Sequence, residues 1–387
     1  MLIKLTDATA ETCGNKAATL AVLRRNGFAV PDGFVVPAPG QTSAAARESA
    51  FQRAVTSELE RLGNPTVAVR SSATNEDTAG ASAAGQYESF LGVQGAQNVR
   101  KAIAACRDSA KTARVRHYWQ HSDTSAADAG GMAVLVQSLI AADVSGVMFT
   151  PAQASETTRI EATWGLGLGV VSGTVTPDAY EISPHDRAIC TTGSKQTRTD
   201  LNDEHCGGIV ETAVAAPMQA ARALNDNEVA ALTQLGMQIS QLLGGPQDIE
   251  FALKNGDFWV LQSRPVTASL PPHREGSPTS PPFALHGRPG AHGVVTAAAR
   301  LVHGPADFSK VRTGEVLVCT YTDPAWTPLF SIASGVITET GGALSHAAIV
   351  ARERAIPAVL GVADAMTRLR TGDRITLDGT AGAITVH

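Results

Sequence analysis

The stretch Gly341-Gly342-Ala343-Leu344-Ser345-His346-Ala347-Ala348-Ile349-Val350-Ala351-Arg352 decides how the rest of the chain is interpreted. We predict a strand over residues 335–338, a turn at the two glycines, and a helix that begins at His346 and ends before Pro357. A histidine in a first helical turn lies beside unpaired backbone N–H groups and the positive end of the helix dipole. A phosphoryl group on its ring would be an anion in a place that stabilises anions. The alternative is a partly buried histidine that packs a turn, and this stretch alone favours that alternative.

Composition narrows the class of protein. The chain has 387 residues, which suggests two or three domains, and 43% of them are hydrophobic, which is ample for packed cores. A net charge of -5 argues against a nucleic-acid partner. We expect no signal peptide and no membrane span, because the N-terminus has no apolar core and no run of about 20 apolar residues occurs. The five scattered cysteines fit neither a disulfide framework nor a zinc site, which indicates reduced thiols in a cytoplasm.

Two N-terminal stretches have residues suited to phosphates. Gly14-Asn15-Lys16 precedes a helix-like run from Ala17 to Asn26, and a lysine there would bring a mobile charge to backbone N–H donors. The alternative is a solvated surface lysine. Further on, Val67-Ala68-Val69-Arg70-Ser71-Ser72 reads as a short strand that Arg70 leaves, followed by a loop of small hydroxyl residues. An arginine with such a loop supplies a bidentate cation and N–H groups to a polyphosphate.

A predicted hairpin over residues 246–266 carries the other polar cluster. Its turn is Asn255-Gly256, a strong hairpin signal between alternating runs. Residues two apart on a strand share a face, so two carboxylates, Asp248 and Glu250, lie near Gln262 and Arg264. Carboxylates hold Mg²⁺ while it keeps waters and phosphate oxygens, and an arginine neutralises charge on a transferring phosphoryl group. The alternative is a surface hairpin with a cross-strand ion pair of little energetic value.

These stretches resemble one family. Residues 341–352, with Ile356-Pro357-Ala358-Val359, are similar to the phosphohistidine swivel domain of the phosphoenolpyruvate-utilising family, which includes phosphoenolpyruvate synthase, pyruvate phosphate dikinase and rifampicin phosphotransferase. Residues 14–34, 67–77 and 246–266 are similar to its ATP-binding domain. The chain departs from the family pattern at three positions: Leu344 replaces threonine or a small residue, Ala355 replaces glycine, and Leu168 replaces an acidic or amide residue.

The resemblance implies an α/β (α+β) fold with two domains. An ATP-grasp-like ATP-binding domain is expected over residues 1–267, and a small β/α phosphohistidine swivel domain over residues 284–387. Residues 268–283 form the linker between them, where five prolines in residues 268–282 exclude helix and strand. At roughly 3 Å per residue such a linker could span on the order of 45 Å.

The resemblance also implies the site residues. His346 would carry the phosphate, with Arg264 and Lys16 as further catalytic residues. The residues expected to bind ATP are Lys16, Arg70, Arg114, Gln137, Glu161, Asp248, Glu250, Gln262 and Arg264. Asp248 and Glu250 would hold Mg²⁺. Arg114 is expected on a helix over residues 111–118, Gln137 near the adenine or ribose, and Glu161 at the nucleotide.

The activity that the resemblance implies is a dikinase-type phosphotransferase with paired acceptors. ATP would phosphorylate His346 with release of AMP and phosphate, and a small molecule with a hydroxyl or amine would accept the phosphoryl group. The first alternative is an ATP-binding and phosphohistidine subunit of a multi-component dikinase, and the second is a degenerate binding module, against which the intact site residues argue. No stretch resembles an acceptor domain, so the acceptor pocket is expected between the domains, on another protomer of a homo-oligomer, or on a partner protein.

Overall fold

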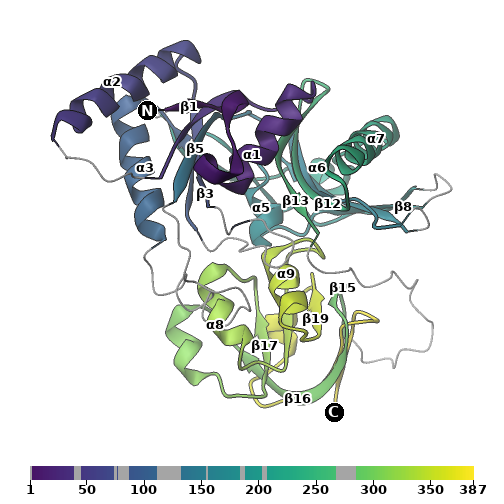
Figure 1. Cartoon of the computed structure of the whole chain (residues 1–387). Helices are drawn as coiled ribbons and strands as arrows, with labels where there is room; N and C mark the ends of the chain where they lie inside the picture. The colour runs from purple at the N-terminus through teal and green to yellow at the C-terminus, as the bar shows by residue number, and fades with distance from the viewer. Residues whose placement is uncertain are drawn as a thin grey trace.

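The protein has a mixed α/β fold, as the sequence predicts. The computed structural model describes residues 2–38, 45–73, 76, 87–110, 132–153, 156–183, 188–202, 207–266 and 285–387. In Figure 1 the elements from β1 to β13 form the upper part of the molecule and those from β14 onward form the lower part. Arg114 and the predicted linker at residues 268–283 lie outside the described residues.

The N-terminal part begins with an antiparallel sheet whose strand order is β1-β2-β5-β3-β4. Its elements, with the 3₁₀ helix η1, are β1 (Ile3–Lys4), η1 (Leu5–Asp7), α1 (Ala10–Arg25), β2 (Gly33–Val36), α2 (Ala45–Arg61), β3 (Val67–Ser72), β4 (Ser89–Val93), α3 (Ala96–Ser109) and β5 (Ala133–Ser138). Helix α1 begins seven residues earlier than the predicted Ala17, because the glycine at position 14 breaks the helix without ending it. That glycine therefore marks a kink inside the helix.

A second antiparallel sheet, with order β13-β12-β6-β7-β8-β9, adjoins the first. Its elements and their neighbours are β6 (Val144–Phe149), β7 (Thr158–Trp164), α5 (Leu168–Ser172), β8 (Asp178–Ile182), β9 (Ala188–Thr191), β10 (Thr197–Leu201), β11 (Ile209–Ala213), α6 (Ala216–Ala220), α7 (Asp226–Leu243), β12 (Gln247–Lys254) and β13 (Asp257–Pro265). Helix α7 has a defined signal at each end. A capping box between Asn225 and Glu228 starts it, and Gly244 ends it in the left-handed conformation.

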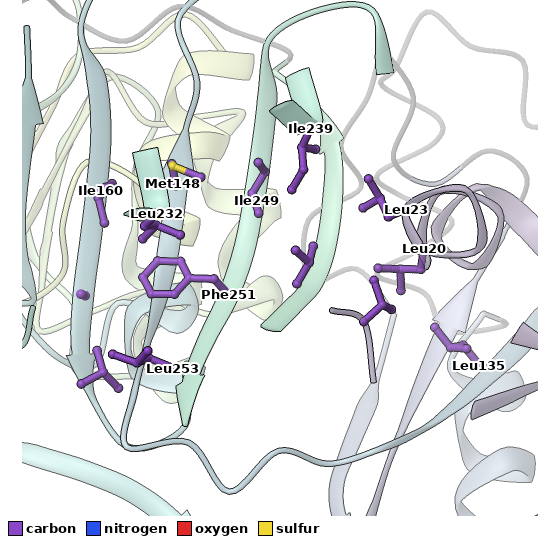
Figure 2. Close-up of a cluster of buried hydrophobic side chains, with 14 of the residues drawn as sticks. Leu20, Leu23, Leu135, Met148, Ile160, Leu232, Ile239, Ile249, Phe251 and Leu253 are labelled. Carbon is purple, nitrogen blue, oxygen red and sulfur yellow. The ribbon is translucent and has the colours of Figure 1, made fainter. Parts of the chain in front are cut away.

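One apolar core joins these two sheets. Leu20 and Leu23 of α1 pack in the same buried cluster as Ile249 and Phe251 of β12. Figure 2 shows the cluster continuing from Ile160 through Phe251 to the side chains of α1. The core therefore fixes α1, and the lysine that follows its kink, relative to the hairpin β12–β13.

The C-terminal part is an eight-stranded sheet with order β14-β21-β20-β16-β17-β18-β19-β15, in which β16 to β19 run parallel. Its elements are β14 (Leu285–His286), β15 (Arg288–Ala291), β16 (Val294–Leu301), η3 (Pro305–Lys310), β17 (Val316–Cys319), η4 (Pro324–Trp326), α8 (Thr327–Phe330), β18 (Gly335–Thr338), α9 (His346–Glu353), β19 (Ala358–Leu360), α10 (Ala365–Arg368), β20 (Arg374–Asp378) and β21 (Ala383–Val386). The predicted strand–turn–helix is confirmed, and α9 begins at His346. Figure 1 shows α9 at the top of this part, facing α5.

Helix α9 ends at a strained alanine, from which a stability change is expected. Ala355 has a φ of 52°, in the left-handed region that glycine adopts freely. The N–H groups of Ala355 and Ile356 donate to the carbonyls of Arg352 and Ala351, a complete Schellman arrangement that requires this φ. We expect Ala355→Gly to raise the free energy of unfolding by about 1 kcal/mol, since a left-handed L-residue costs roughly that amount. Denaturant unfolding measures the change, and an unchanged or lower stability would contradict it.

Candidate functional site

Lys16 is placed by the kink in α1. Gly14 has a φ of 77°, and a Cβ there would lie 2.1 Å from the Ser72 carbonyl oxygen, so only glycine lets α1 press against the end of β3. The Ala17 N–H donates to the Ser72 hydroxyl (3.1 Å). The Lys16 ammonium is buried and donates to Glu76 at 2.7 Å. Lys16 is thus a buried, paired cation and not the solvated surface lysine of the alternative interpretation.

Arg70 lies within β3 and not at its end, because the strand continues to Ser72. Its guanidinium Nη1 donates to the Leu261 carbonyl (3.2 Å) and lies 3.5 Å from the Glu250 carboxylate. Arg70 therefore reaches from the first sheet to the hairpin β12–β13 of the second, and its charge lies between the two sheets.

The predicted hairpin is confirmed. Asp248 pairs with Arg264 and Glu250 with Gln262 across β12 and β13, and a bulge follows Glu250. The Asp248 carboxylate accepts from Arg264 Nε and Nη2, both at 2.8 Å. Burial raises the pKa of Asp248, and Arg264 opposes that rise. The pair thus supplies a buried carboxylate and a cation held on one face of the hairpin.

A cavity of about 420 Å³ lies where these elements meet. Five of the residues expected to bind ATP line it: Lys16, Arg70, Glu250, Gln262 and Arg264. Its apolar lining includes Leu91, Leu139, Ile140, Leu166, Leu168, Phe251 and Leu261. Pro324 adds a wall from the C-terminal part of the chain. A pocket with a cationic end and an apolar end suits a molecule that joins phosphates to an aromatic base.

Three predicted ATP ligands lie away from the lining of this cavity within the described residues. Asp248 lies behind Arg264, to which it is bonded. The Gln137 side chain is buried and donates to the Pro31 carbonyl (3.1 Å). Glu161 lies on β7 at the contact between the two parts of the chain.

His346 is the first residue of α9 and is 3% exposed. Its Nδ1 lies 3.1 Å from the Thr322 hydroxyl, and the Phe330 ring meets the imidazole edge-on at 6.3 Å. Thr322 is two residues before Pro324, which borders the cavity. The loop that orients the histidine is therefore also part of the cavity wall.

Glu161 holds the histidine loop to the N-terminal part. Its carboxylate accepts from the N–H groups of Ala343 (2.7 Å) and Leu344 (3.1 Å). A Cβ on Gly342 would lie 2.2 Å from the nearer carboxylate oxygen, so a larger residue there would displace the Glu161 carboxylate from its present position. Arg288 Nη1 lies 3.7 Å from the same carboxylate. Glu161 is thus a docking residue in this structure.

Other contacts cross the same boundary. The Thr340 hydroxyl donates to the Gly173 carbonyl (2.6 Å) after α5. Arg352 of α9 donates to the carbonyls of Gly290 and Ala343 and lies over the Phe149 ring. Burial lowers the pKa of Arg352 to about 10, whereas the charges of Asp248 and Glu161 oppose that shift. Arg352 therefore links the histidine helix electrostatically to the hairpin of the cavity.

We expect the docked arrangement to weaken as the pH rises. Burial raises the pKa of Glu161 above its ordinary value of 4.5, although Arg288, the two loop N–H groups and Arg352 oppose this. When docking raises the pKa of a carboxyl group, the docked state binds more protons than the undocked state. The docked state is therefore favoured below pH 4.5, and this stabilisation is lost as the pH rises through the raised pKa. Small-angle X-ray scattering from pH 4 to 8 should show an increasing radius of gyration. The dependence should flatten in Glu161→Gln, and an identical curve for that variant would contradict the assignment.

Some residues of the site had no signal of their own in the sequence. Glu76 was visible only as part of the stretch around Arg70, and its pairing with Lys16, 60 positions away, depends on the kink at Gly14. Thr322 stands in an ordinary turn sequence, and its contact with the histidine is tertiary. Arg288 has no motif around it. Each became recognisable only when distant segments were brought together.

The donor set can be compared with what a metal ion requires. In the described part of the chain, no group of three or more His, Cys, Asp and Glu side chains is placed to hold a metal ion. A Mg²⁺ ion needs fewer protein ligands than that, because one or two carboxylates are enough when the phosphates of the nucleotide supply further oxygen ligands to the ion. Glu250 lines the cavity and fits that requirement, whereas Asp248 lies outside the lining and is paired with Arg264. Separately, none of the described helices is long and apolar enough to cross a membrane.

Comparison with known proteins agrees with this geometry. Residues 44–279 match the family "Pyruvate phosphate dikinase, AMP/ATP-binding domain", and residues 311–382 match "PEP-utilising enzyme, mobile domain". The chain is 35% identical over 331 residues to a probable phosphoenolpyruvate synthase of Methanothermobacter thermautotrophicus, covering 84% of this chain and 48% of that protein.

Two further relatives agree. The probable phosphoenolpyruvate synthase of Pyrococcus horikoshii is 36% identical over 336 residues, covering 82% of this chain and 40% of the relative. The phosphoenolpyruvate synthase of Escherichia coli is 33% identical over 346 residues, covering 82% and 43%. The chain spans less than half the length of each of these three relatives. It belongs to the pyruvate phosphate dikinase family, with an AMP/ATP-binding domain followed by a phosphoenolpyruvate-utilising mobile domain.

Proposed function

We propose that this protein is a dikinase-type phosphotransferase that uses ATP to phosphorylate His346 and passes the phosphoryl group to a small molecule with a hydroxyl or amine. The observation that carries the proposal is the mobile domain's position: the loop that orients His346 borders the same cavity that Lys16, Arg70 and Arg264 line. The loop that contacts the histidine and the cations proposed to bind phosphate thereby border one cavity.

Different residues of the cavity would bind different parts of ATP. Lys16, Arg70 and Arg264 would bind the phosphates, and the apolar residues of the cavity lining would bind the base. Glu250, which lines the cavity, would hold Mg²⁺ that neutralises phosphate charge, while Asp248 positions Arg264. Leu168 supplies apolar surface to the cavity where the family has an acidic or amide side chain, so a polar contact from this position is absent.

The histidine acts as the nucleophile in this proposal. Its Nδ1 is engaged by Thr322, which leaves Nε2 as the nitrogen that attacks. A lone pair of Nε2 forms a bond to the β-phosphorus. The bond from that phosphorus to the oxygen that bridges it to the α-phosphorus breaks, and AMP leaves with the electron pair on that oxygen. Hydrolysis then releases the γ-phosphate as inorganic phosphate and leaves one phosphoryl group on His346.

Thr322 is the positioning residue for this attack. Thr322→Val keeps the shape of the side chain but removes the hydroxyl, and a hydrogen bond of about 1 kcal/mol corresponds to a several-fold slower phosphorylation. The pH dependence of the rate should shift as well, because the ring nitrogen loses its partner. Rapid-quench measurement of phosphoenzyme formation across pH tests this, and a variant with the same rate and pH profile would contradict it.

The nucleotide product tests the function. Purified protein incubated with ATP, Mg²⁺ and a panel of alcohols and amines should form AMP and inorganic phosphate in equal amounts. Formation of ADP as the sole nucleotide product would contradict the dikinase reaction.

The second candidate is a subunit that donates its phosphoryl group to a separately encoded acceptor protein. Phosphoenzyme that no small molecule discharges, but that a partner protein does, would identify it.

A further inference from the structure

Leu344 lies in an apolar cluster whose other members belong to the ATP-binding domain. Its side chain is 2% exposed. The other members of the cluster are Val147 and Phe149 of β6, Val170 of α5 and, at the border, Val266. Leu344 is also one of the positions at which the chain departs from the family pattern. An apolar side chain of the mobile domain is therefore buried against the other domain.

The apolar side chains of the histidine helix are buried elsewhere. The core of the mobile domain takes up those of Ala347, Ala348, Val350 and Ala351. Within the part of the chain that the structure describes, Leu344 shares no apolar cluster with its own domain. If the mobile domain moved away, this side chain would lose the apolar partners of its cluster. The free energy of its burial therefore stabilises the docked arrangement.

A closed turn connects the position of Leu344 to that of His346. The N–H and the hydroxyl of Ser345 both donate to the Gly342 carbonyl, at 3.2 Å and 2.8 Å. The Leu344 N–H donates to the Glu161 carboxylate (3.1 Å). Ser345 is the N-cap of α9, and His346 follows it directly. When Leu344 is fixed against the ATP-binding domain, the start of α9 and the imidazole are fixed with it.

Helix α5 separates the seat of Leu344 from the ATP cavity. Leu168 and Val171 are three apart on this helix, so they share a face, and both line the cavity. Val170 packs with Leu344 in the interdomain cluster. The same short helix thus has one face at the proposed nucleotide site and another against the histidine loop.

We propose that Leu344 is a positioning residue, whose side chain anchors the histidine loop between β6 and α5 and so holds His346 at the ATP cavity. The role of His346 in this proposal rests on the proposed function, whereas the packing involves no nucleotide. Full burial of a leucine side chain shifts an equilibrium at least about tenfold. A threonine at this position would have less apolar surface and would add a hydroxyl to an apolar cluster.

Hydrogen exchange of the Ala343 amide measures the docking equilibrium, because this N–H donates to Glu161 across the domain boundary (2.7 Å). The experiment uses the 387-residue chain without nucleotide. Leu344→Thr should raise the exchange rate, corrected for the intrinsic rate of the new sequence, at least about tenfold. Leu344→Met keeps an apolar side chain of similar volume and should exchange at least about threefold more slowly than Leu344→Thr. A wild-type rate in Leu344→Thr, or equal rates in the two variants, would overturn the proposal.

A variant of α5 tests the anchor from the opposite domain. Val170→Ala removes apolar surface without altering the loop, and it should raise the exchange rate of the Ala343 amide at least about threefold. Because Val170 and Leu344 form one contact, the double variant with Leu344→Thr should exchange more slowly than the product of the two single effects predicts. Single effects that multiply in full, or a wild-type rate in Val170→Ala, would overturn this contact as the anchor.

Leu369→Thr is the matched control. Leu369 is a buried leucine of the mobile domain, but it packs in a different core with Val316 and Val318 of β17. Its replacement should speed exchange in β17 and leave the exchange rate of the Ala343 amide within about twofold of the wild type. A rise at Ala343 equal to that of Leu344→Thr would show general loosening of the domain and would overturn the proposal.

The exchange experiment is independent of phosphotransfer. A chain that forms no phosphohistidine, but whose loop is released in Leu344→Thr, would contradict the proposed function and support the anchor. A chain that forms phosphohistidine, but whose Ala343 exchange is the same in Leu344→Thr, would contradict the anchor alone.

Discussion

His346→Ala should abolish phosphoenzyme formation and the conversion of ATP to AMP, while ATP still binds. The physical reason is that the nucleophile and the nucleotide pocket belong to different domains: the imidazole lies at the start of α9, whereas the cavity is lined mainly by α1, β3 and the hairpin β12–β13. Removal of the nucleophile removes the acceptor of the first transfer and leaves the phosphate-binding cations in place. The measurement is rapid-quench counting of protein-bound phosphate, together with calorimetric titration of ATP.

His292→Ala is the matched control for that variant. His292 is an exposed histidine of the same mobile domain and lies between β15 and β16, away from α9. Its removal should change neither phosphoenzyme formation nor ATP binding. If His346→Ala still phosphorylated an acceptor, the phosphoryl group would pass directly from ATP and the histidine would have another role.

Arg264→Met should reduce phosphotransfer at least about 100-fold and also destabilise the fold. The loss of activity follows from removing a cation aimed at the phosphates. The loss of stability follows from the burial of its partner: the side chains of Arg264 and Asp248 are 11% and 6% exposed, and Arg264 opposes the burial that raises the pKa of Asp248. Removing one member of a buried pair costs about 3–5 kcal/mol. Denaturant unfolding and phosphoenzyme kinetics measure the two effects separately.

The double variant Asp248→Asn with Arg264→Met distinguishes a catalytic pair from a structural one. Without the buried carboxylate charge, most of the lost stability should return, whereas the activity should not. Arg100→Met is the control, because Arg100 pairs at 3.4 Å with Glu48, whose side chain is 65% exposed. That change should cost at most about 1 kcal/mol. A double variant that regains activity together with stability would show that the pair only supports the fold.

The parts of the site that could be predicted are those with local causes. The Asn255-Gly256 turn predicts the hairpin, and the two-residue period of strands predicts that Asp248 and Glu250 share a face. The bulge after Glu250, which brings Arg264 opposite Asp248, was not predicted. The start of α9 at His346 follows equally from the glycine turn before it. Both are short-range consequences of turn chemistry.

The start of α1 and the position of Glu161 could not be predicted in the same way. A glycine followed by a helix-like run indicates a helix start, and only the close approach of Ser72 shows that Gly14 is a kink. The family resemblance predicts that Glu161 contacts the nucleotide. In the structure its carboxylate accepts hydrogen bonds from backbone N–H groups 182 and 183 residues further along the chain. Such pairings depend on how the domains meet, for which one sequence contains no local signal.

Those pairings matter for the proposed mechanism because the mobile domain must occupy two positions, one at the ATP cavity and one at the acceptor, and the pairings belong to the first. Glu161, Thr340 and the contact of Arg352 with Phe149 hold the mobile domain where its histidine loop borders the ATP cavity. Delivery to an acceptor then requires these contacts to break. A phosphoryl group on His346 would add negative charge to the loop that Glu161 contacts, and the repulsion between the two anions would favour release.

The most direct test of the account is the site and origin of the phosphoryl group. The protein is incubated with ATP labelled at either the β- or the γ-phosphate, and the labelled peptide is identified by mass spectrometry under conditions that preserve acid-labile phosphate. The account predicts one phosphoryl group from the β-position on His346. Label from the γ-position alone, or label on a residue other than His346, would contradict it.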